Sequence, residues 1–273
     1  LLGVTVLLTG LGLIMVLSAS SVDSMKQTNS AFSVFFKQGI VAVLGVLLMG
    51  VVSTLPVALF KRLSVLLAFG AIGLQLLTVF TPLGVSVNGN RNWIDILGFR
   101  IQPSEFIKVA MILIAAILLE SRSHELDDVK NTWLIPLLGG AAFFWVPVLF
   151  GGDVGTVIIM AFIMLGMAYL GGLPKKIWIA ILILAAIALP VIMRSSTSRW
   201  GRIMAWLNPN APDPNGYNWQ SEHGTWALSA GGLFGVGLGQ SKLKWSWIPE
   251  AENDFIFAVI GEETGLVGTV ALI

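Results

Sequence analysis

Long apolar runs alternate with short polar segments along most of the chain. A run of about 20 apolar residues is long enough to cross a bilayer as a helix. Backbone groups that face lipid must bond within their own segment, so each run is expected to be helical. The pattern predicts an all-α, polytopic transmembrane protein with about eight spans in a single domain over residues 1–273. The expected spans are Leu1–Ser18, Gly39–Phe60, Leu63–Ser86, Pro103–Leu119, Trp133–Gly152, Val154–Leu173, Ile177–Met193 and a last one from Asp254 to Ile273.

Composition agrees with this class. Hydrophobic residues make up 56% of the chain and charged residues 11%, whereas a soluble domain carries about 25% charged residues. The absence of cysteine from the sequence excludes disulfides and thiolate metal sites. A net charge of +1 does not indicate a nucleic-acid-binding surface. Because the sequence begins and ends inside apolar runs, we interpret it as truncated at both ends.

The loops between the runs alternate sides of the membrane. One set holds residues 19–38, 87–102, 151–153 and 194–253, and the other holds 61–62, 120–132 and 174–176. The positive-inside rule places the second set in the cytoplasm, because its short loops carry more lysine and arginine. The first set is then extracytoplasmic. Its long loop, 194–253, contains six of the ten tryptophans and is expected to lie against the outer membrane surface.

Three polar clusters accompany the loops and helix starts of the middle region. Arg91 and Trp93 offer a cation and a ring that either anchor the loop at the interface or contact a ligand. Pro103 suits the first turn of a helix, and Glu105 and Lys108 share a helix face, as a local ion pair or as lining of a cavity. Asp153 either caps the helix that follows it or lines a cavity.

The glycine-rich stretch 231–240 contains no GxGxxG and no P-loop pattern, and no expected strand leads into it. A nucleotide site is therefore not indicated. Close packing of the backbone is the expected use of these glycines. The two histidines are isolated: His124 lies in an acidic loop, and His223 lies beside Glu222. Neither predicts a metal site.

An acidic cluster marks the start of the last span. Glu250, Glu252 and Asp254 fall within five residues, and Glu262 and Glu263 follow deeper in the expected helix. Carboxylates at that depth are costly in lipid, so they are expected to face protein or a wet cavity. Asp254 has three open interpretations. It caps the helix, or it holds a divalent cation, or it acts as a base whose pKa its neighbours raise.

With these motifs the chain resembles the SEDS family (shape, elongation, division and sporulation) of membrane peptidoglycan polymerases. The resemblance covers most of the chain and is closer to division members (FtsW-like) than to elongation members (RodA-like), on Ser18–Ser21 read with Gly261–Glu263. The matching stretches are Asn88–Ile94, Gln102–Lys108, Asp153–Thr156, Gly231–Gly239 and Pro249–Glu263. The family has about ten spans, so about two lie outside this sequence.

The resemblance implies a peptidoglycan glycosyltransferase of the bacterial cytoplasmic membrane. It would polymerise lipid II into glycan strands at the outer face during cell division. Asp254 matches the aspartate essential for polymerisation, and it is also the candidate metal ligand for magnesium or manganese. Further substrate-binding residues that the motifs imply are Trp93, Arg91, Glu105, Lys108, Asp153 and Glu250. Arg199 and Arg202 join them as diphosphate contacts on charge and position alone.

Three positions depart from the family pattern. Glu252 stands where many members carry histidine, Thr264 where leucine is common, and Asn92 where arginine commonly precedes the tryptophan. These departures concern local details of the substrate site.

The implied partners are lipid II, membrane lipid and a class B penicillin-binding protein, the transpeptidase that cross-links the new strand. Two other functions stay open: a lipid II flippase, and a scaffold without catalysis. An elongation-type polymerase is a further alternative. The apolar cores of most spans favour chemistry at the outer surface over transport through the midplane.

Overall fold

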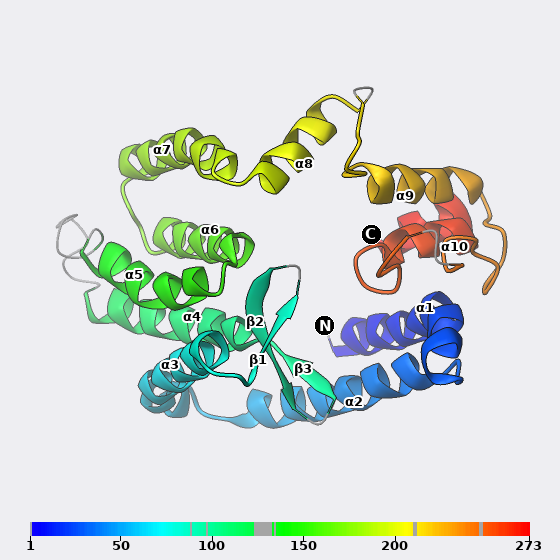
Figure 1. Cartoon of the computed structure of the whole chain (residues 1–273). Helices are drawn as coiled ribbons and strands as arrows, with labels where there is room; N and C mark the ends of the chain where they lie inside the picture. The colour runs from blue at the N-terminus through cyan, green and yellow to red at the C-terminus, as the bar shows by residue number, and fades with distance from the viewer. Residues whose placement is uncertain are drawn as a thin grey trace. The chain divides into compact units, whose positions relative to one another are not determined.

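The computed structural model describes residues 2–87, 89–96, 98–122, 133, 135–209, 212–245 and 248–273. His124 and Asn88, considered above, lie outside these residues, as does Trp247, one of the six tryptophans of the long loop. The described chain is mostly helical, as predicted. Its elements are α1 (Leu2–Thr28), α2 (Ser33–Thr54), α3 (Val57–Phe80), β1 (Gly84–Val87), β2 (Asn90–Ile96), β3 (Phe99–Ile101), α4 (Pro103–Ser121), α5 (Ile135–Phe150), α6 (Val154–Leu170), α7 (Lys175–Arg194), α8 (Thr197–Leu207), α9 (Trp219–Ala230) and α10 (Ile256–Leu272) (Figure 1).

The chain forms two compact units, which are described separately. Unit 1 comprises Leu1–Thr54 and Pro190–Ile273, and unit 2 comprises Leu55–Leu189. Among the described helices, α1, α2, α3 and α7 are long and apolar enough to span a membrane, and α6 is a shorter apolar helix. α2 and α7 are described throughout, and neither has a buried residue. Their apolar side chains are therefore available to lipid.

Unit 2 is a bundle of α3, α4, α5 and α6. Its tightest contact joins α3 to α4, where alanines on both helices allow a close approach of the backbones. Lys61 near the start of α3 forms an ion pair with Glu120 near the end of α4, at 2.6 Å. The buried core of the unit contains Ala68, Ala71, Ile72, Ile107, Ala110, Met111, Ala115, Phe144, Val148, Met160 and Met164.

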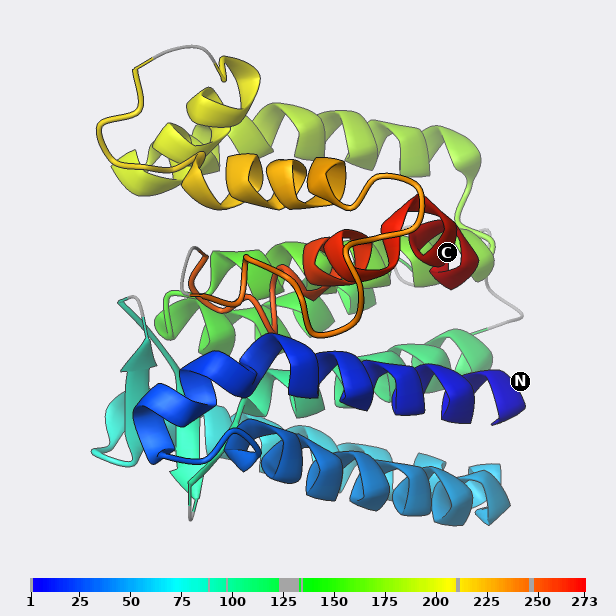
Figure 2. The ribbon, with the colours of Figure 1, turned by 90° about the vertical axis from the view of Figure 1, so that its right-hand side faces the viewer.

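A three-stranded antiparallel sheet, ordered β1-β2-β3, joins α3 to α4. Figure 2 shows it at one end of these two helices. The expected span Leu63–Ser86 was therefore wrong at its end, because the helix stops at Phe80 before Pro82. The sheet was not predicted for residues 87–102. Its strands are short, and their pairing depends on turns at Gly89 and Gly98, both with φ of +83°.

Unit 1 is built around α10. Figure 2 shows α10 between α9 and α1, and contacts on both sides agree with that view. α1 also packs along α2. The core of the unit contains Met15, Ala19, Ala227, Leu243, Ile248, Ala251, Ala258, Val259 and Ile260.

Several expected helix boundaries were wrong in the first part of the chain. α1 continues to Thr28, ten residues beyond the expected end at Ser18. The turn between the second and third helices lies at Pro56, whose extended backbone (ψ 143°) starts α3. Lys61 and Arg62, expected in a loop, are therefore in the first turns of α3. Proline decides this boundary, because it cannot continue a helix that precedes it.

In its described part, the long segment 194–253 contains two helices, α8 and α9. α8 begins at a capping serine, Ser196, and Arg194 stacks on the ring of Trp200 at 4.5 Å. The backbone after α8 is held by Asn218, whose side chain donates to the carbonyl of Ala205 (3.0 Å). The backbone amide of Asn218 donates to the carboxylate of Asp213 (2.7 Å). This hydrogen bond holds the pKa of Asp213 below its ordinary value.

Candidate functional site

α10 is a broken helix. Gly265 has φ 71° and ψ −169°, a conformation that only glycine adopts readily, in the middle of an otherwise helical segment. In an unbroken helix the carbonyl of Glu262 would accept a hydrogen bond from the amide of Leu266, four residues on. The break removes that bond and its neighbour. Two carbonyls and two amides inside the helix must find other partners.

The glycine-rich segment 231–239 supplies those partners. A Cβ at Gly235 or at Gly265 would collide with the backbone of the other segment, so both positions require glycine for close approach. The close backbone packing expected of this stretch is confirmed. Four hydrogen bonds replace the missing helical ones: Leu266 N to Gly232 O (2.9 Å), Val267 N to Leu233 O (3.2 Å), Val236 N to Glu262 O (2.9 Å) and Gly237 N to Glu263 O (3.1 Å).

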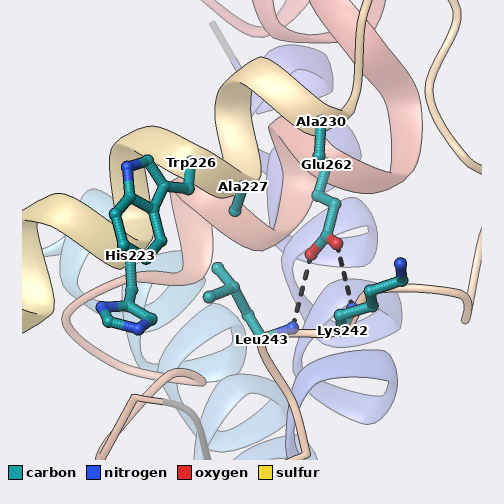
Figure 3. Close-up of a pocket in the computed structure, with 7 residues that line it drawn as sticks. All are labelled: His223, Trp226, Ala227, Ala230, Lys242, Leu243 and Glu262. Atoms are coloured by element: carbon teal, nitrogen blue, oxygen red, sulfur yellow. Dashed lines mark hydrogen bonds between the residues drawn. The ribbon is translucent and has the colours of Figure 1, made fainter.

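The side chain of Glu262 is buried, with 2% of its surface exposed. One carboxylate oxygen accepts from the hydroxyl of Ser241 (2.5 Å) and the amide of Leu243 (3.4 Å). The other accepts from the amide of Lys242 (3.0 Å). Figure 3 shows the carboxylate directed at these two amides. This carboxylate is therefore bound to a segment about 20 residues earlier in the chain.

The side chain of Glu263 is also buried, with 1% exposed. Its Oε1 accepts from the hydroxyl of Ser18 on α1 (2.6 Å) and from the amide of Ser241 (3.3 Å). The ammonium of Lys244 lies 4.0 Å from the same oxygen and also donates to the carbonyl of Gly239. We call Glu262, Glu263 and the groups that bind them the carboxylate clasp. The expectation that these glutamates face protein is confirmed.

The acidic turn that precedes α10 leaves Asp254 exposed. Glu250 has a left-handed backbone (φ 57°), and its carbonyl accepts from the amides of Asn253 and Asp254, both at 3.0 Å. The Glu250 carboxylate accepts from the amide group of Asn253 at 2.6 Å. The Asp254 side chain makes no hydrogen bond or ion pair with the residues that the structure describes. It does not cap α10, because the capping position is Phe255.

Glu252, in the acidic turn, is half-buried. Burial raises the pKa of Glu252, and the negative charges of Glu250 and Asp23 raise it further. Its Oε2 is buried without a hydrogen-bond partner among the described residues. Met15 and Ala19 of α1 pack in one core cluster with Ala251, so the second half of α1 lies near the acidic turn. Residues 19–38 and 194–253 were assigned to one side of the membrane, and this proximity within unit 1 agrees with that assignment.

A pocket of ≈ 200 Å³ lies beside the clasp, between α9 and α10. Figure 3 shows its lining residues: His223, Trp226, Ala227, Ala230, Lys242, Leu243 and Glu262. His223 is buried and its Nδ1 lies 2.8 Å from the carbonyl of Trp219. Its ring also contacts the rings of Trp219 and Trp226. This histidine is thus a packed core residue of α9.

In unit 2, Asp153 caps α6. One carboxylate oxygen accepts from the amide of Thr156 (2.9 Å), and the other accepts from its hydroxyl (2.7 Å) and from the side chain of Gln102 (3.2 Å). The capping interpretation is therefore confirmed. The corner 151–153 also packs on β2, because the amide of Arg91 donates to the carbonyl of Gly151 (2.9 Å).

Arg91 and its neighbours are also engaged within unit 2. The Arg91 guanidinium donates from Nη2 to the carbonyl of Thr81 at 2.6 Å. Asn92, one of the departures from the family pattern, is buried and accepts from Gln75 at 3.3 Å. Trp93 is half-buried on β2. The Asn92 side chain packs against Gly151, where an added Cβ would collide with it.

The remaining candidates are charged side chains on helices. Glu105 and Lys108 form the expected ion pair at 2.7 Å in the first turns of α4, with Glu105 55% exposed. Arg202 is exposed on α8 and Arg199 is half-buried. Both arginines belong to unit 1, as does Asp254, whereas Glu105 and Lys108 belong to unit 2. The structure thus divides the predicted site residues between the two units.

A cation held by protein ligands alone does not fit the described residues, which contain no group of three or more histidines, aspartates or glutamates suited to a metal. A magnesium ion needs fewer protein ligands, because it retains water and bridges to substrate phosphates. One exposed carboxylate, Asp254, fits that second arrangement.

A family profile with the description "cell cycle protein", which covers the FtsW, RodA and SpoVE proteins, matches residues 1–273. The chain belongs to this family. A probable peptidoglycan glycosyltransferase FtsW of Mycobacterium tuberculosis is 38% identical over 98% of the chain. Another from Nitrosococcus halophilus is 34% identical over 100% of the chain and 70% of its own length. The stage V sporulation protein E of Bacillus subtilis is 32% identical over 97% of the chain and 72% of its own length.

The FtsW-like resemblance drawn from the motifs is confirmed by these relatives, and with it a multi-pass protein of the cytoplasmic membrane. The chain spans about half the length of the mycobacterial relatives that it matches (51%). Among solved structures, one of a peptidoglycan synthase complex for polymerization and crosslinking matches with a TM-score of 0.73 and 21% identity, over 98% of this chain and 71% of that one. The RodA protein of Thermus thermophilus matches with a TM-score of 0.58 and 20% identity, over 95% and 68%. Both likenesses show the fold.

Sequence reasoning missed three residues that bind the buried glutamates: Ser241, Lys244 and, as a contact, Ser18. Ser18 was noted only as part of the FtsW-like pattern. Ser241 and Lys244 lie in a polar stretch between the glycines and the acidic turn, and no local pattern distinguishes them. Their partners are about 20 residues away, so only the tertiary structure reveals the contact.

Proposed function

We propose that this protein is a peptidoglycan glycosyltransferase that polymerises lipid II at the outer face of the cytoplasmic membrane during cell division. Family membership and relatives that carry this activity in their names support the proposal. The observation that carries it here is the exposed carboxylate of Asp254. It stands at the entry of a broken helix and is left unbound by every residue that the structure describes.

Asp254 is the general base of the proposed reaction. The 4-hydroxyl of the acceptor sugar attacks C1 of the donor sugar, and the bond from C1 to the diphosphate breaks. The Asp254 carboxylate accepts the hydroxyl proton, and undecaprenyl diphosphate leaves. An unpaired carboxylate suits this role, since an ion pair or hydrogen bond would compete for the same oxygen.

Two arginines of unit 1 are the proposed contacts of the diphosphate. Arg202 is exposed and Arg199 half-buried on α8, and guanidinium groups bind phosphate oxygens in a bidentate manner. In the alternative role Asp254 would not accept the proton but would hold a magnesium or manganese ion, and that ion would neutralise the leaving diphosphate. Glu250 stands beside Asp254 on the same turn and is a second contact of the substrate site.

Trp93, Glu105, Lys108, Asp153 and Arg91 are proposed to support substrate binding from unit 2. In that unit Arg91 and Asp153 have protein partners, so their role is to hold the loop between α3 and α4 in shape. Among these five residues only Glu105 is exposed, and Trp93 and Lys108 are half-buried. The proposed protein partner is a class B penicillin-binding protein, and the structural likeness to a synthase complex for polymerization and crosslinking supports it.

The test is polymerisation of labelled lipid II by the purified full-length protein with its transpeptidase and a divalent cation. Asp254→Ala should abolish glycan polymer while the protein still folds, because the side chain has no bond to lose. The matched control is Glu222→Gln, which removes an exposed carboxylate from α9. Polymer of normal length from Asp254→Ala would contradict the assignment.

The flippase alternative has its own outcome. If the folded wild-type complex makes no polymer but moves lipid II across vesicle membranes, and Asp254→Ala still does so, transport replaces polymerisation as the function. If neither activity is found while the transpeptidase copurifies, the scaffold alternative is favoured.

A further inference from the structure

We infer that Glu262 and Glu263 are positioning residues for Asp254, acting through the carboxylate clasp. This inference rests on the proposed function, which makes Asp254 the reacting carboxylate. Both glutamates are buried whereas Asp254 is exposed, so they act through the chain that connects them. Burial of two adjacent carboxylates is costly, and apolar residues of similar volume often pack such a space equally well or better. We therefore assign the clasp a positioning role and not only a stabilising one.

The first contact of the clasp closes a loop. Glu262 binds Ser241, Lys242 and Leu243, which lie 21, 20 and 19 residues before it. The intervening chain carries the acidic turn with Asp254. Both ends of that chain are thus held at one point, and the range of positions open to the turn is reduced.

The second contact ties the loop to α1. Ser18 donates to Glu263 at 2.6 Å, and Met15 and Ala19 on the same helix pack in the core with Ala251. Ala251 is three residues before Asp254. The polar contact and the apolar contact together fix the acidic turn relative to α1. Placement of a reacting group within a fraction of an ångström is what such a support provides.

The charge balance of the clasp makes it sensitive to substitution. Lys244 is the one ammonium near the two carboxylates in the described part of unit 1, at 4.0 Å from Glu263. The remaining stabilisation of Glu262 comes from a hydroxyl and two amides. Oε2 of Glu263 is already buried without a hydrogen-bond partner among the described residues. Loss of a further donor leaves the clasp with a second poorly bound oxygen, and we expect this to loosen the segment 241–244.

The test compares Ser241→Ala and Glu262→Gln with wild type in the full-length protein. Two quantities are measured: kcat and KM for polymerisation of lipid II, and amide hydrogen exchange of residues 241–255. Misplacement by about 1 Å costs about a hundredfold in rate. We therefore expect kcat to fall by about ten- to a hundredfold in Glu262→Gln, and by less in Ser241→Ala, with KM changed by less than about twofold. Exchange should accelerate in 241–255 and not in α3–α6.

Two further variants separate positioning from folding. Ser229→Ala removes an exposed hydroxyl of α9 that bonds only within its helix, and it should leave kcat and exchange unchanged. Glu262→Ala should lose more activity than Glu262→Gln, which keeps one acceptor oxygen. A graded loss in kcat at constant KM supports positioning.

The inference is overturned if exchange in 241–255 rises while kcat stays normal, since the clasp would then be broken without effect. It is also overturned if exchange rises throughout both units and KM rises with it, since that is loss of folding. Failure of the proposed function is distinguishable from both. If the proposed function is wrong, the wild-type protein itself makes no polymer, and the positioning role is then rejected together with the function.

Discussion

The acidic turn of unit 1 and the loop of unit 2 that carries Arg91 and Trp93 use polar residues in opposite ways. In unit 2, Arg91 bonds to a carbonyl and Asp153 bonds to a threonine and a glutamine of the same unit. In unit 1, Asp254 has no such partner in the described chain, while the buried glutamates nearby have several. Polar residues that are satisfied internally stabilise shape, and an unsatisfied exposed one is available to a substrate. Asp254 thus differs from Arg91 and Asp153 in having no partner among the residues that the structure describes.

The largest stability effect is expected at the break of α10. Gly265→Ala places a side chain at φ 71° and ψ −169° and against the backbone of Gly235. Strain and collision together should lower the free energy of unfolding by more than about 3 kcal/mol. The control is Gly70→Ala on α3, where an added Cβ meets nothing within 4 Å. Thermal unfolding in detergent measures both. Equal melting temperatures for the two variants would contradict the role given to the break.

A smaller effect on stability should distinguish Asp153 from Asp254. Asp153→Ala removes a helix cap and should cost about 1 kcal/mol of stability. Asp254→Ala removes an unbonded exposed side chain and should change stability by less than about 0.5 kcal/mol. Activity should show the reverse order, with Asp254→Ala the more severe. A larger loss of stability in Asp254→Ala would show that the carboxylate is bound after all, and the contrast between the units would fail.

The pH dependence of stability tests the surroundings of Glu252. Its pKa is raised above the ordinary value of 4.5, so the folded state keeps this proton to a higher pH than the unfolded state does. Stability from this group is therefore greatest below pH 4.5 and falls as pH rises through the raised pKa. Glu252→Gln should melt at a higher temperature than wild type at neutral pH, and at the same temperature at low pH.

The stability that Asp213 contributes should depend on pH in the opposite direction to that of Glu252. Its pKa is lowered by the hydrogen bond from Asn218, so its contribution is present above pH 3.8 and is lost as pH falls. Asp213→Asn should therefore reduce the melting temperature at neutral pH and have less effect in acid. The same direction of change for both variants would contradict the assigned surroundings of Glu252.

The smallest effect is expected at the ion pair of α4. Glu105 is 55% exposed and pairs with Lys108 within one helix. Such pairs contribute about 0.3–0.5 kcal/mol, so Glu105→Gln should hardly change the melting temperature. A double-mutant cycle with Lys108→Gln measures the coupling. If polymerisation nevertheless falls in Glu105→Gln, the pair belongs to the substrate site, and unit 2 contributes more than shape.

Local signals predicted much of this fold. The start of α6 at Val154 followed from the glycines and aspartate before it, and the whole of α7 differs from its predicted span by three residues or fewer. A cap and a proline act on the residues beside them, so one sequence is enough to find them. The extended end of α1 was missed for the opposite reason. Its last residues are polar, and hydrophobicity alone does not carry the helix beyond Ser18.

Contacts between residues that are distant in the sequence could not be predicted from the sequence alone. The sheet of β1, β2 and β3 depends on pairings between short strands, and the clasp joins Ser18, Ser241 and Glu263 across most of the chain. The sequence placed buried carboxylates in the last helix and required partners for them, but it did not identify those partners. The sequence thus predicted Asp254 and the acidic turn of the candidate site. The carboxylate clasp was found only in the structure.

The break in α10 also bears on the order in which the chain is made. Two amides and two carbonyls of that helix bond to the segment around Gly231–Gly239, and unbonded groups of this kind are costly in lipid. That segment precedes α10 in the sequence, so the ribosome delivers it first. When α10 emerges, its partners are already present at the membrane. A circular permutant with α10 ahead of α9 would expose those groups during insertion, and we expect it to be degraded before it assembles.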